Sequence, residues 1–301
     1  MIDPRRLKVL RALADHGTVT SAGHALHLTP SAVSQQLAAL EAETGQELLR
    51  RKGRRVSLTP AGELLLGHAN AVLAELERAE ASLAGYSAGT AGRVEVASFA
   101  SAITLVVAPA VAALRRTAPD VTVLVRDAEG HASLPMLLDG EIDVAVTMEY
   151  RSSPRADDQR LAMDPLYAEP FDLVLPPDHR LAALAEVDVR DLVDDDWVAP
   201  LPGNPCRDIA LLACENAGFQ PRIRHTSDDF RAVAALVAAG AGVALVPRTA
   251  LRDARAVVRP VAGQSPTRRV FAAVRQGSER HPLVGAVRQA LREAADAHRE
   301  S

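Results

Sequence analysis

Cysteine is scarce in this sequence, and long hydrophobic runs are absent. The 301 residues include two cysteines, Cys206 and Cys214, too few for the disulfide framework of a small secreted protein. No stretch approaches the ~18 unbroken apolar residues of a membrane span, and the first residues lack the apolar core of a signal peptide. These absences predict a cytoplasmic protein without a membrane partner. The apolar residues, 48% of the chain, are enough to form the cores of two or three packed domains.

Lysine is also rare, since Lys8 and Lys52 are the two lysines of the chain. Arginine therefore carries nearly all the positive charge, a bias typical of GC-rich genomes. Residues 1–59 hold nine Lys and Arg against five Asp and Glu, a net charge of +4, whereas the remainder carries −8. A basic end on an acidic body predicts that the first segment binds a polyanion such as DNA.

Three short helices are predicted within residues 3–45. Asp3 and Pro4 form a typical helix start, and Gly17 ends this first helix. Thr20 is expected to cap a second helix over residues 21–27, and Thr29-Pro30 to open a third that runs to about residue 43 and ends at Gly45. Two short helices joined by a tight turn form a helix-turn-helix.

The third helix has a distinct inner and outer face. Val33, Leu37 and Leu40 recur at helical spacing and are expected to be buried. The outer face is predicted to carry Ser31, Ser34, Gln35 and Ala38.

A β-hairpin is predicted next, from residues 47–51 and 55–58 around the turn Lys52-Gly53-Arg54. Its cations are Arg50, Arg51, Lys52, Arg54 and Arg55. Such a run is usually a solvated face, but beside a helix-turn-helix it favours contact with DNA phosphates.

A long helix is predicted from Thr59-Pro60 to about Gly85, with an apolar seam at alternating steps of four and three residues. The seam consists of Leu65, Ala69, Val72, Leu76, Ala79 and Leu83. Because an isolated helix cannot bury such a seam, the pattern predicts dimerisation through it; the alternative is packing on the chain's own domain.

Beyond a linker at residues 85–92, apolar strands alternate with helices, which predicts an α/β fold. The predicted strands are 94–97, 121–125, 142–148, 171–175, 197–199, 222–225, 243–246 and 270–274. The predicted helices are 101–117, 131–139, 189–192, 207–217, 230–239 and 282–298. Since parallel sheets bind ligands beyond the carboxyl ends of their strands, two β/α subdomains are expected to form a cleft.

Short polar residues follow several of these strands and are candidate contacts for a ligand in this cleft. They are Ser98, Ser101, Thr147, Pro202, Gly203, Asn204 and Thr226. Each is as typical of a turn or a helix cap as of a ligand contact. Asp228-Asp229 is expected to cap the following helix, with ligand binding as the minority interpretation.

Enzymatic and metal chemistry have little support. Gly85-x-Ser87-x-Gly89 fits a nucleophile pattern, but a hydrolase needs this serine on a sharp turn between a strand and a helix. His24 and His27 lie three apart on the second helix without residues nearby to complete a metal site. We expect no catalytic residue, no metal and no cofactor.

The sequence closely resembles the LysR-type transcriptional regulators along almost its whole length. The resemblance rests on Gly17-Thr18-Val19-Thr20, Thr29-Pro30-Ser31-Ala32-Val33-Ser34-Gln35-Gln36-Leu37, Leu48-Leu49-Arg50-Arg51, Leu58-Thr59-Pro60-Ala61-Gly62, Gly140-Glu141-Ile142-Asp143, Gly218-Phe219-Gln220-Pro221 and 237–247. Gly23 and Leu49 depart from the usual Ala and Phe, and Gly130 stands where members often carry a ligand-binding Ser or Thr.

The resemblance implies a winged helix-turn-helix at 1–59, a linker (dimerisation) helix and hinge at 60–91, and a periplasmic-binding-protein-like effector domain at 92–301. In that domain subdomain I is about 92–163 and 265–301, and subdomain II about 164–264. The implied partners are double-stranded DNA, a small and often anionic effector, a second or further copy of the chain in a homodimer or homotetramer, and RNA polymerase.

The resemblance also assigns residues. Pro30, Ser31, Ser34 and Gln35 match the family's DNA-contacting positions, with Gln35 as the base reader because its amide can pair with an adenine edge. Thr20, at a helix N-terminus, is expected to bind phosphate.

A redox alternative stays open. Peroxide-sensing members carry a cysteine pair in a stretch similar to residues 206–214. When Arg207-Asp208 is aligned with that stretch, Cys214 takes the second cysteine position, and Cys206 lies one residue C-terminal to the first.

Overall fold

The computed structural model describes residues 2–52, 55–86, 91–149, 158, 160–251 and 255–299. At the N-terminus a small head contains α1 (Pro4–His16), α2 (Val19–Ala25), α3 (Pro30–Thr44), β1 (Leu49–Lys52) and β2 (Arg55–Leu58). The three predicted helices and the hairpin are confirmed, with β1 and β2 antiparallel and Leu49 opposite Leu58.

Local capping explains the helices of the head. The Asp3 side chain accepts a hydrogen bond from the Arg5 N–H, and Gly17 ends α1 in the left-handed conformation with a φ of 70°. The prediction that Thr20 caps α2 is wrong. The chain leaves Gly17 directly into an extended Thr18, whose Oγ1 accepts from the Ser21 N–H at 3.1 Å, so Thr20 lies inside the helix.

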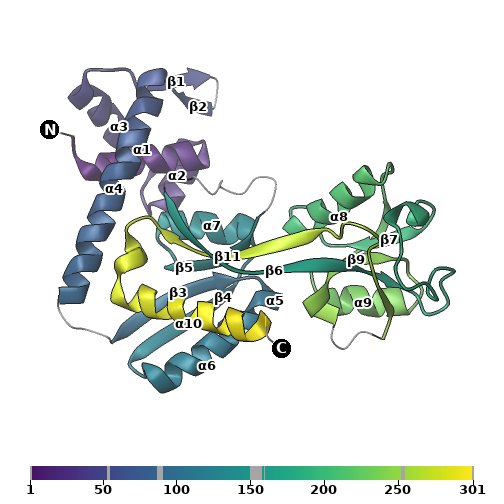
Figure 1. Cartoon of the computed structure of the whole chain (residues 1–301). Coiled ribbons are helices and arrows are strands. Elements are labelled where there is room, and N and C mark those ends of the chain that lie inside the picture. The colour runs from purple at the N-terminus through teal and green to yellow at the C-terminus, as the bar shows by residue number, and fades with distance from the viewer. Residues whose placement is uncertain are drawn as a thin grey trace.

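The long helix α4 (Pro60–Tyr86) joins the head to the larger body (Figure 1). Its first half completes the core of the head: Ala69 is fully buried there, and Leu65 packs on the same cluster. Ala69, one position of the predicted seam, thus packs within the head of its own chain.

The body has two lobes. The first lobe holds β3 (Gly92–Ser98), β4 (Val121–Asp127), β5 (Val144–Met148), α5 (Ala100–Ala102), the π-helical η1 (Ile103–Val107), α6 (Ala108–Thr117), α7 (Gly130–Asp139), the 3-10 turn η4 (Ser278–Arg280) and α10 (Pro282–Arg299). The parallel strands β3, β4 and β5 have α6 and α10 on one face and α7 on the other (Figure 1).

The second lobe holds η2 (Val189–Leu192), β7 (Asp196–Ala199), α8 (Pro205–Asn216), β8 (Arg222–Thr226), α9 (Phe230–Ala238), β9 (Ala244–Pro247), η3 (Arg248–Leu251) and β10 (Val257–Pro260). Two long antiparallel strands, β6 (Leu161–Leu175) and β11 (Thr267–Arg275), run between the lobes (Figure 1). The α/β architecture is confirmed, although the sheet is mixed rather than parallel throughout.

Two strands were missed in whole or in part. β6 begins at Leu161 rather than at residue 171, and β10 was not predicted. Charged and proline residues interrupt the apolar pattern of the first half of β6, and pairing with β11 compensates for them.

One helical run among the described residues, Ala100–Thr117, has the length and composition of a possible membrane span. Here it packs in the core of the first lobe, where Val106, Val107 and Leu114 are buried. A core helix passes the same test of length and composition.

Candidate functional site

The outer face of α3 is largely accessible to solvent. Val33, Leu37 and Leu40 are buried, as predicted, whereas Gln35 and Ser31 are exposed and Ser34 is half-buried. The Gln35 amide is therefore accessible to a partner molecule.

The start of α3 is well capped. Thr29 Oγ1 accepts from the Ala32 N–H at 3.2 Å and lies 3.1 Å from Ser31 Oγ. Pro30 occupies the first helical position and is exposed. Thr20, in the first turn of α2, is exposed as well.

The hairpin places three of its predicted DNA contacts on paired strands, since Arg51 is opposite Val56 and Lys52 is opposite Arg55. The fourth, Arg54, lies outside the described residues.

The predicted effector residues divide into two groups. Ser98, Thr147 and Asn204 are buried and Ser101 is half-buried, whereas Pro202, Gly203 and Thr226 are exposed. Asn204 caps α8, and its Oδ1 accepts from the Cys206 N–H at 2.9 Å. The exposed three make no described side-chain contact with the buried group.

Ser101 belongs to a buried network that the sequence did not predict. Arg268, at 1% exposure, donates from Nη2 to Ser101 Oγ at 2.9 Å and from Nε to Glu169 Oε1 at 2.7 Å. Glu169 Oε2 in turn accepts from the Thr249 N–H at 3.1 Å. Arg268 lies on β11 and Glu169 on β6, so this ion pair joins the two strands that connect the lobes.

A sequence signal for this pair existed. Arg268 shares strand alternation with the buried Val270 and Ala272, and Glu169 shares it with Tyr167 and Phe171. A charge on the apolar face of a strand predicts a buried partner, although sequence alone does not identify that partner.

Both cysteines are buried. Cys206 Sγ lies 3.8 Å from Arg268 Nη1 and 3.9 Å from Met148 Sδ. Burial raises the pKa of the Cys206 thiol to about 11, although the Arg268 guanidinium opposes this shift, and burial raises the pKa of Cys214 to about 12. Eight residues of one helix, ~12 Å of rise, separate the two thiols, too far for a disulfide while α8 is intact.

A second polar cluster joins the lobes nearer the surface. Asn204 Nδ2 donates to Asp228 Oδ1 at 3.0 Å and to Glu129 Oε1 at 3.4 Å. Glu129 precedes α7 in the first lobe, whereas Asn204 and Asp228 belong to the second. Burial raises the pKa of Glu129 to about 7, and the nearby carboxylates of Asp228 and Asp127 add to the shift. Asp229 caps α9, as expected.

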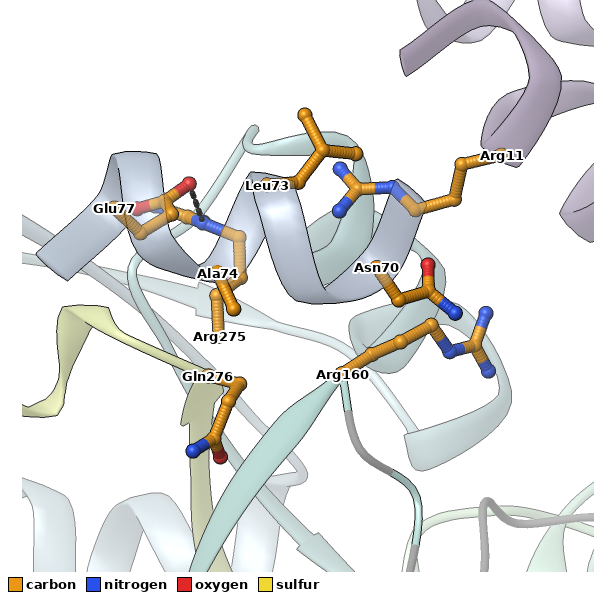
Figure 2. Close-up of a pocket in the computed structure, with 8 residues that line it drawn as sticks. All are labelled: Arg11, Asn70, Leu73, Ala74, Glu77, Arg160, Arg275 and Gln276. Atoms are coloured by element: carbon orange, nitrogen blue, oxygen red, sulfur yellow. Dashed lines mark hydrogen bonds and ion pairs between the residues drawn. The ribbon is translucent and has the colours of Figure 1, made fainter. Parts of the chain in front are cut away.

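A third cluster lies where the head meets the body. Figure 2 shows Arg11 from α1 and Arg160, which directly precedes β6, converging on α4, around a small cavity that is also lined by Asn70, Glu77, Arg275 and Gln276. Arg160 forms an ion pair with Asp15, and His16 Nε2 lies 3.0 Å from Asp139 Oδ1. Arg275 Nε donates to Glu77 Oε1 at 3.0 Å. The head and α4 are thereby tied to the first lobe.

The second half of α4 presents an apolar stripe outward. Val72, Leu76 and Leu83 are 40%, 43% and 67% exposed, and Ala79 is also exposed. These four are the later positions of the predicted seam.

The nucleophile pattern does not have the required geometry. Gly85 lies in the last turn of α4, so no strand precedes it, and Ser87 and Gly89 lie outside the described residues.

Two family models match the chain. The bacterial regulatory helix-turn-helix model of the LysR family matches residues 4–63, and the LysR substrate binding domain model matches residues 87–296.

Similar proteins cover nearly the whole chain. A probable hydrogen peroxide-inducible genes activator of Mycobacterium avium is 30% identical over 279 residues, 91% of this chain and 88% of that protein. The HTH-type transcriptional regulator MetR of Escherichia coli is 29% identical over 300 residues, 98% of this chain and 92% of that protein.

Solved structures share the fold. An H2O2-bound mutant of OxyR from Corynebacterium glutamicum superposes with a TM-score of 0.62 at 23% identity and covers 99% of this chain and 94% of its own. HinK of Pseudomonas aeruginosa superposes with a TM-score of 0.59 at 23% identity, covering 98% of each chain.

Proposed function

The chain belongs to the LysR family of bacterial transcriptional regulators, and we propose which of its residues bind DNA, a second chain and an effector. Members of this family are DNA-binding regulators with an effector-binding domain, not enzymes. We assign DNA binding to residues 1–59, dimerisation to 60–91 and effector binding to 92–301. The protein acts in the cytoplasm, where its DNA and RNA polymerase are.

DNA readout rests on one observation, the accessible outer face of α3. Gln35 projects from its second turn, where it can pair with an adenine edge in the major groove. The phosphate contacts come from Thr20, Ser31, Ser34, Arg51, Lys52, Arg54 and Arg55, and Pro30 packs against the DNA at the start of the same helix.

The experiment is footprinting followed by binding measurements on single-base variants of the protected site. Gln35→Ala should cost about 1–3 kcal/mol at one base position per half-site and little elsewhere. Arg54→Ala should weaken all sequences alike and flatten the salt dependence. Gln46→Ala, an exposed glutamine beyond α3, is the matched control. Uniform loss of affinity in Gln35→Ala would remove its role as the base reader.

Dimerisation uses the exposed stripe of Val72, Leu76, Ala79 and Leu83, next to the half-buried Leu65. Leu76→Asp introduces a charge into this apolar surface and should shift the full chain to a smaller species in sedimentation. Leu64→Asp is the control, because Leu64 is 69% exposed on another face of the same helix. An unchanged oligomer in Leu76→Asp contradicts the interface. Additional contacts between the effector-binding domains of different chains would join two dimers into a tetramer.

The effector binds where the lobes meet, at Ser98, Ser101, Thr147 and Asn204. This position supports regulation because the same lobes carry the contacts to the head, including Arg160 with Asp15. Binding can shift the DNA-bound geometry only by its differential affinity for two states, about 1–3 kcal/mol. Ser101→Ala should abolish the ligand response while DNA affinity without ligand is kept.

Redox sensing through Cys206 is the second candidate, favoured by the contact of Cys206 Sγ with the Arg268 guanidinium. A cation beside a thiol favours thiolate formation, but here Glu169 already neutralises Arg268, and burial keeps the thiol protonated. Cys206→Ser is therefore expected to leave the footprint after peroxide treatment equal to that of the wild type. A footprint that changes with peroxide only when Cys206 is present would instead establish the redox function.

A further inference from the structure

The cluster of Glu129, Asn204 and Asp228 brings two carboxylates from opposite lobes to one amide. The Asn204 Oδ1 is held by the helix-cap bond from the Cys206 N–H, so its Nδ2 must face the carboxylates. This cap fixes the orientation of the amide without ambiguity. Asn204 is 4% exposed, so the shared amide lies inside the protein.

Two carboxylates elsewhere in the body, the half-buried Asp164 and the buried Asp172, each have an arginine partner. Asp164 lies 2.6 Å from Arg288, and Asp172 lies 2.8 Å from Arg248. Among the described residues, by contrast, the side chains of Glu129 and Asp228 receive hydrogen bonds only from the Asn204 amide and the Leu201 N–H.

The nearby Arg268 does not fill this gap, because Glu169 holds it in an ion pair. Glu129 is half-buried, and the exposed Asp228 lies close enough to disfavour its negative charge further. The position therefore has an excess of negative charge where a ligand could supply the missing cation.

A buried hydroxyl lies on the face of β5 that α7 covers. Thr147 is 2% exposed, and its Oγ1 has no hydrogen-bond partner among the described residues. Along β5, Val146 and Met148 face one core cluster, whereas Ala145 faces the α7 side, so strand alternation turns Thr147 toward α7. Residues 140–143 lead from α7 directly back into β5, so the start of α7, which Glu129 precedes, lies toward the same end of the sheet as Thr147. Thr147 thus offers a third acceptor on the α7 side of this position.

We propose that the effector of this regulator carries a primary ammonium group, which Glu129, Asp228 and Thr147 receive between the lobes. This inference rests on the proposed effector function of the same region. An ammonium group has three donors and one positive charge, which match three acceptors and two carboxylates. A cation in this position also draws Glu129 and Asp228, and hence the two lobes, together. The often anionic effectors implied by the family resemblance would face repulsion here.

The test uses three four-carbon probes that differ only in their end groups: putrescine, 1,4-butanediol and succinate. Binding to the full chain is measured by calorimetry and by the shift in melting temperature. Putrescine should bind and raise the melting temperature, whereas the diol and the diacid should not. Magnesium chloride is measured in parallel to separate an organic ammonium group from a metal ion.

Variants and pH locate the binding. Glu129→Gln and Asp228→Asn should each weaken putrescine at least about tenfold, whereas Glu215→Gln, an exposed glutamate at the end of α8, should have no effect. Because Glu129 must be charged, binding should tighten about tenfold from pH 6 to pH 8. The charged groups that face it are Asp228, Asp127 and Arg268.

Several results overturn the proposal. The proposal is wrong if no putrescine binding is lost on replacing Glu129, if the diol binds as well as putrescine, or if magnesium binds and displaces putrescine. Succinate binding that is lost in Ser101→Ala would reject the ammonium group but keep the effector site. Loss of sequence-specific DNA binding by the wild type would instead reject the proposed function itself.

Discussion

The junction between head and body and the cluster between the lobes are both rich in charge, yet they are built differently. At the junction Arg160 pairs with Asp15 and Asp158, and Arg275 pairs with Glu77. Between the lobes, Glu129 and Asp228 share one neutral amide.

The difference separates charges that hold the structure from charges that are available to a ligand. Paired groups have exchanged water for a fixed partner and lose stability when that partner is removed. Carboxylates without a cation destabilise the folded chain until a proton or a ligand neutralises them.

Arg268→Met should destabilise the protein by about 3–5 kcal/mol, because Glu169 would remain buried without its cation. Urea unfolding measures the loss. Arg269→Met is the matched control, since Arg269 is 69% exposed and 3.9 Å from Glu149, and should cost less than about 0.5 kcal/mol. Equal losses of stability in the two variants would show that burial of the ion pair does not increase its contribution.

Gly277→Ala should separate α4 from the body. A Cβ at this position would lie 2.2 Å from the Ala74 carbonyl oxygen, and the backbone φ is +101°. Gly263→Ala carries a similar backbone strain at φ +76°, with nothing within 4 Å, and is the control. Unfolding should show an additional loss of about 1–3 kcal/mol in Gly277→Ala. If both variants lose the same amount, the close approach to α4 is not a constraint.

Glu129→Gln should stabilise the protein at pH 8 by about 1–2 kcal/mol. The pKa of Glu129 in the folded chain is about 7, above the ordinary 4.5, so folding favours the protonated acid. The wild type should therefore lose stability relative to the variant as the pH rises from about 4.5 to 7, and the difference should be complete above pH 7. Unfolding curves at pH 5, 6, 7 and 8 measure it. A difference that does not change with pH would contradict the shifted pKa.

The ion pair of Asp15 and Arg160 should show the smallest effect. A double-mutant cycle with Asp15→Ala and Arg160→Ala should give a coupling of about 0.5–1 kcal/mol, because both side chains are partly buried. The exposed pair of Asp296 and Arg299 should give almost none. A coupling no greater than that of the exposed pair would mean that the junction depends on packing alone.

Features that depend on neighbouring residues could be predicted before the fold was known. Asp3 with Pro4, Thr29 with Pro30, and the glycines at 17 and 45 set the helix ends of the head through contacts within a few residues. Most strands and helices of the body followed from apolar spacing for the same reason. Thr18 rather than Thr20 caps α2, because the chain becomes extended directly after the left-handed Gly17. By residue type alone, either threonine of Thr-Val-Thr could have been the cap.

Contacts between residues that are distant in the chain could not be predicted in this way. Arg268 and Glu169 are 99 residues apart, and only the pairing of β6 with β11 brings them together. The sequence offered Asn204 as a ligand contact or a helix cap, and only the packing of the lobes made its amide the link between Glu129 and Asp228. On α4 the repeat of apolar residues was visible in the sequence, yet the head buried Ala69 and left Leu76 exposed. A local pattern fixes which face of an element is apolar, whereas the partner of that face depends on how the whole chain packs.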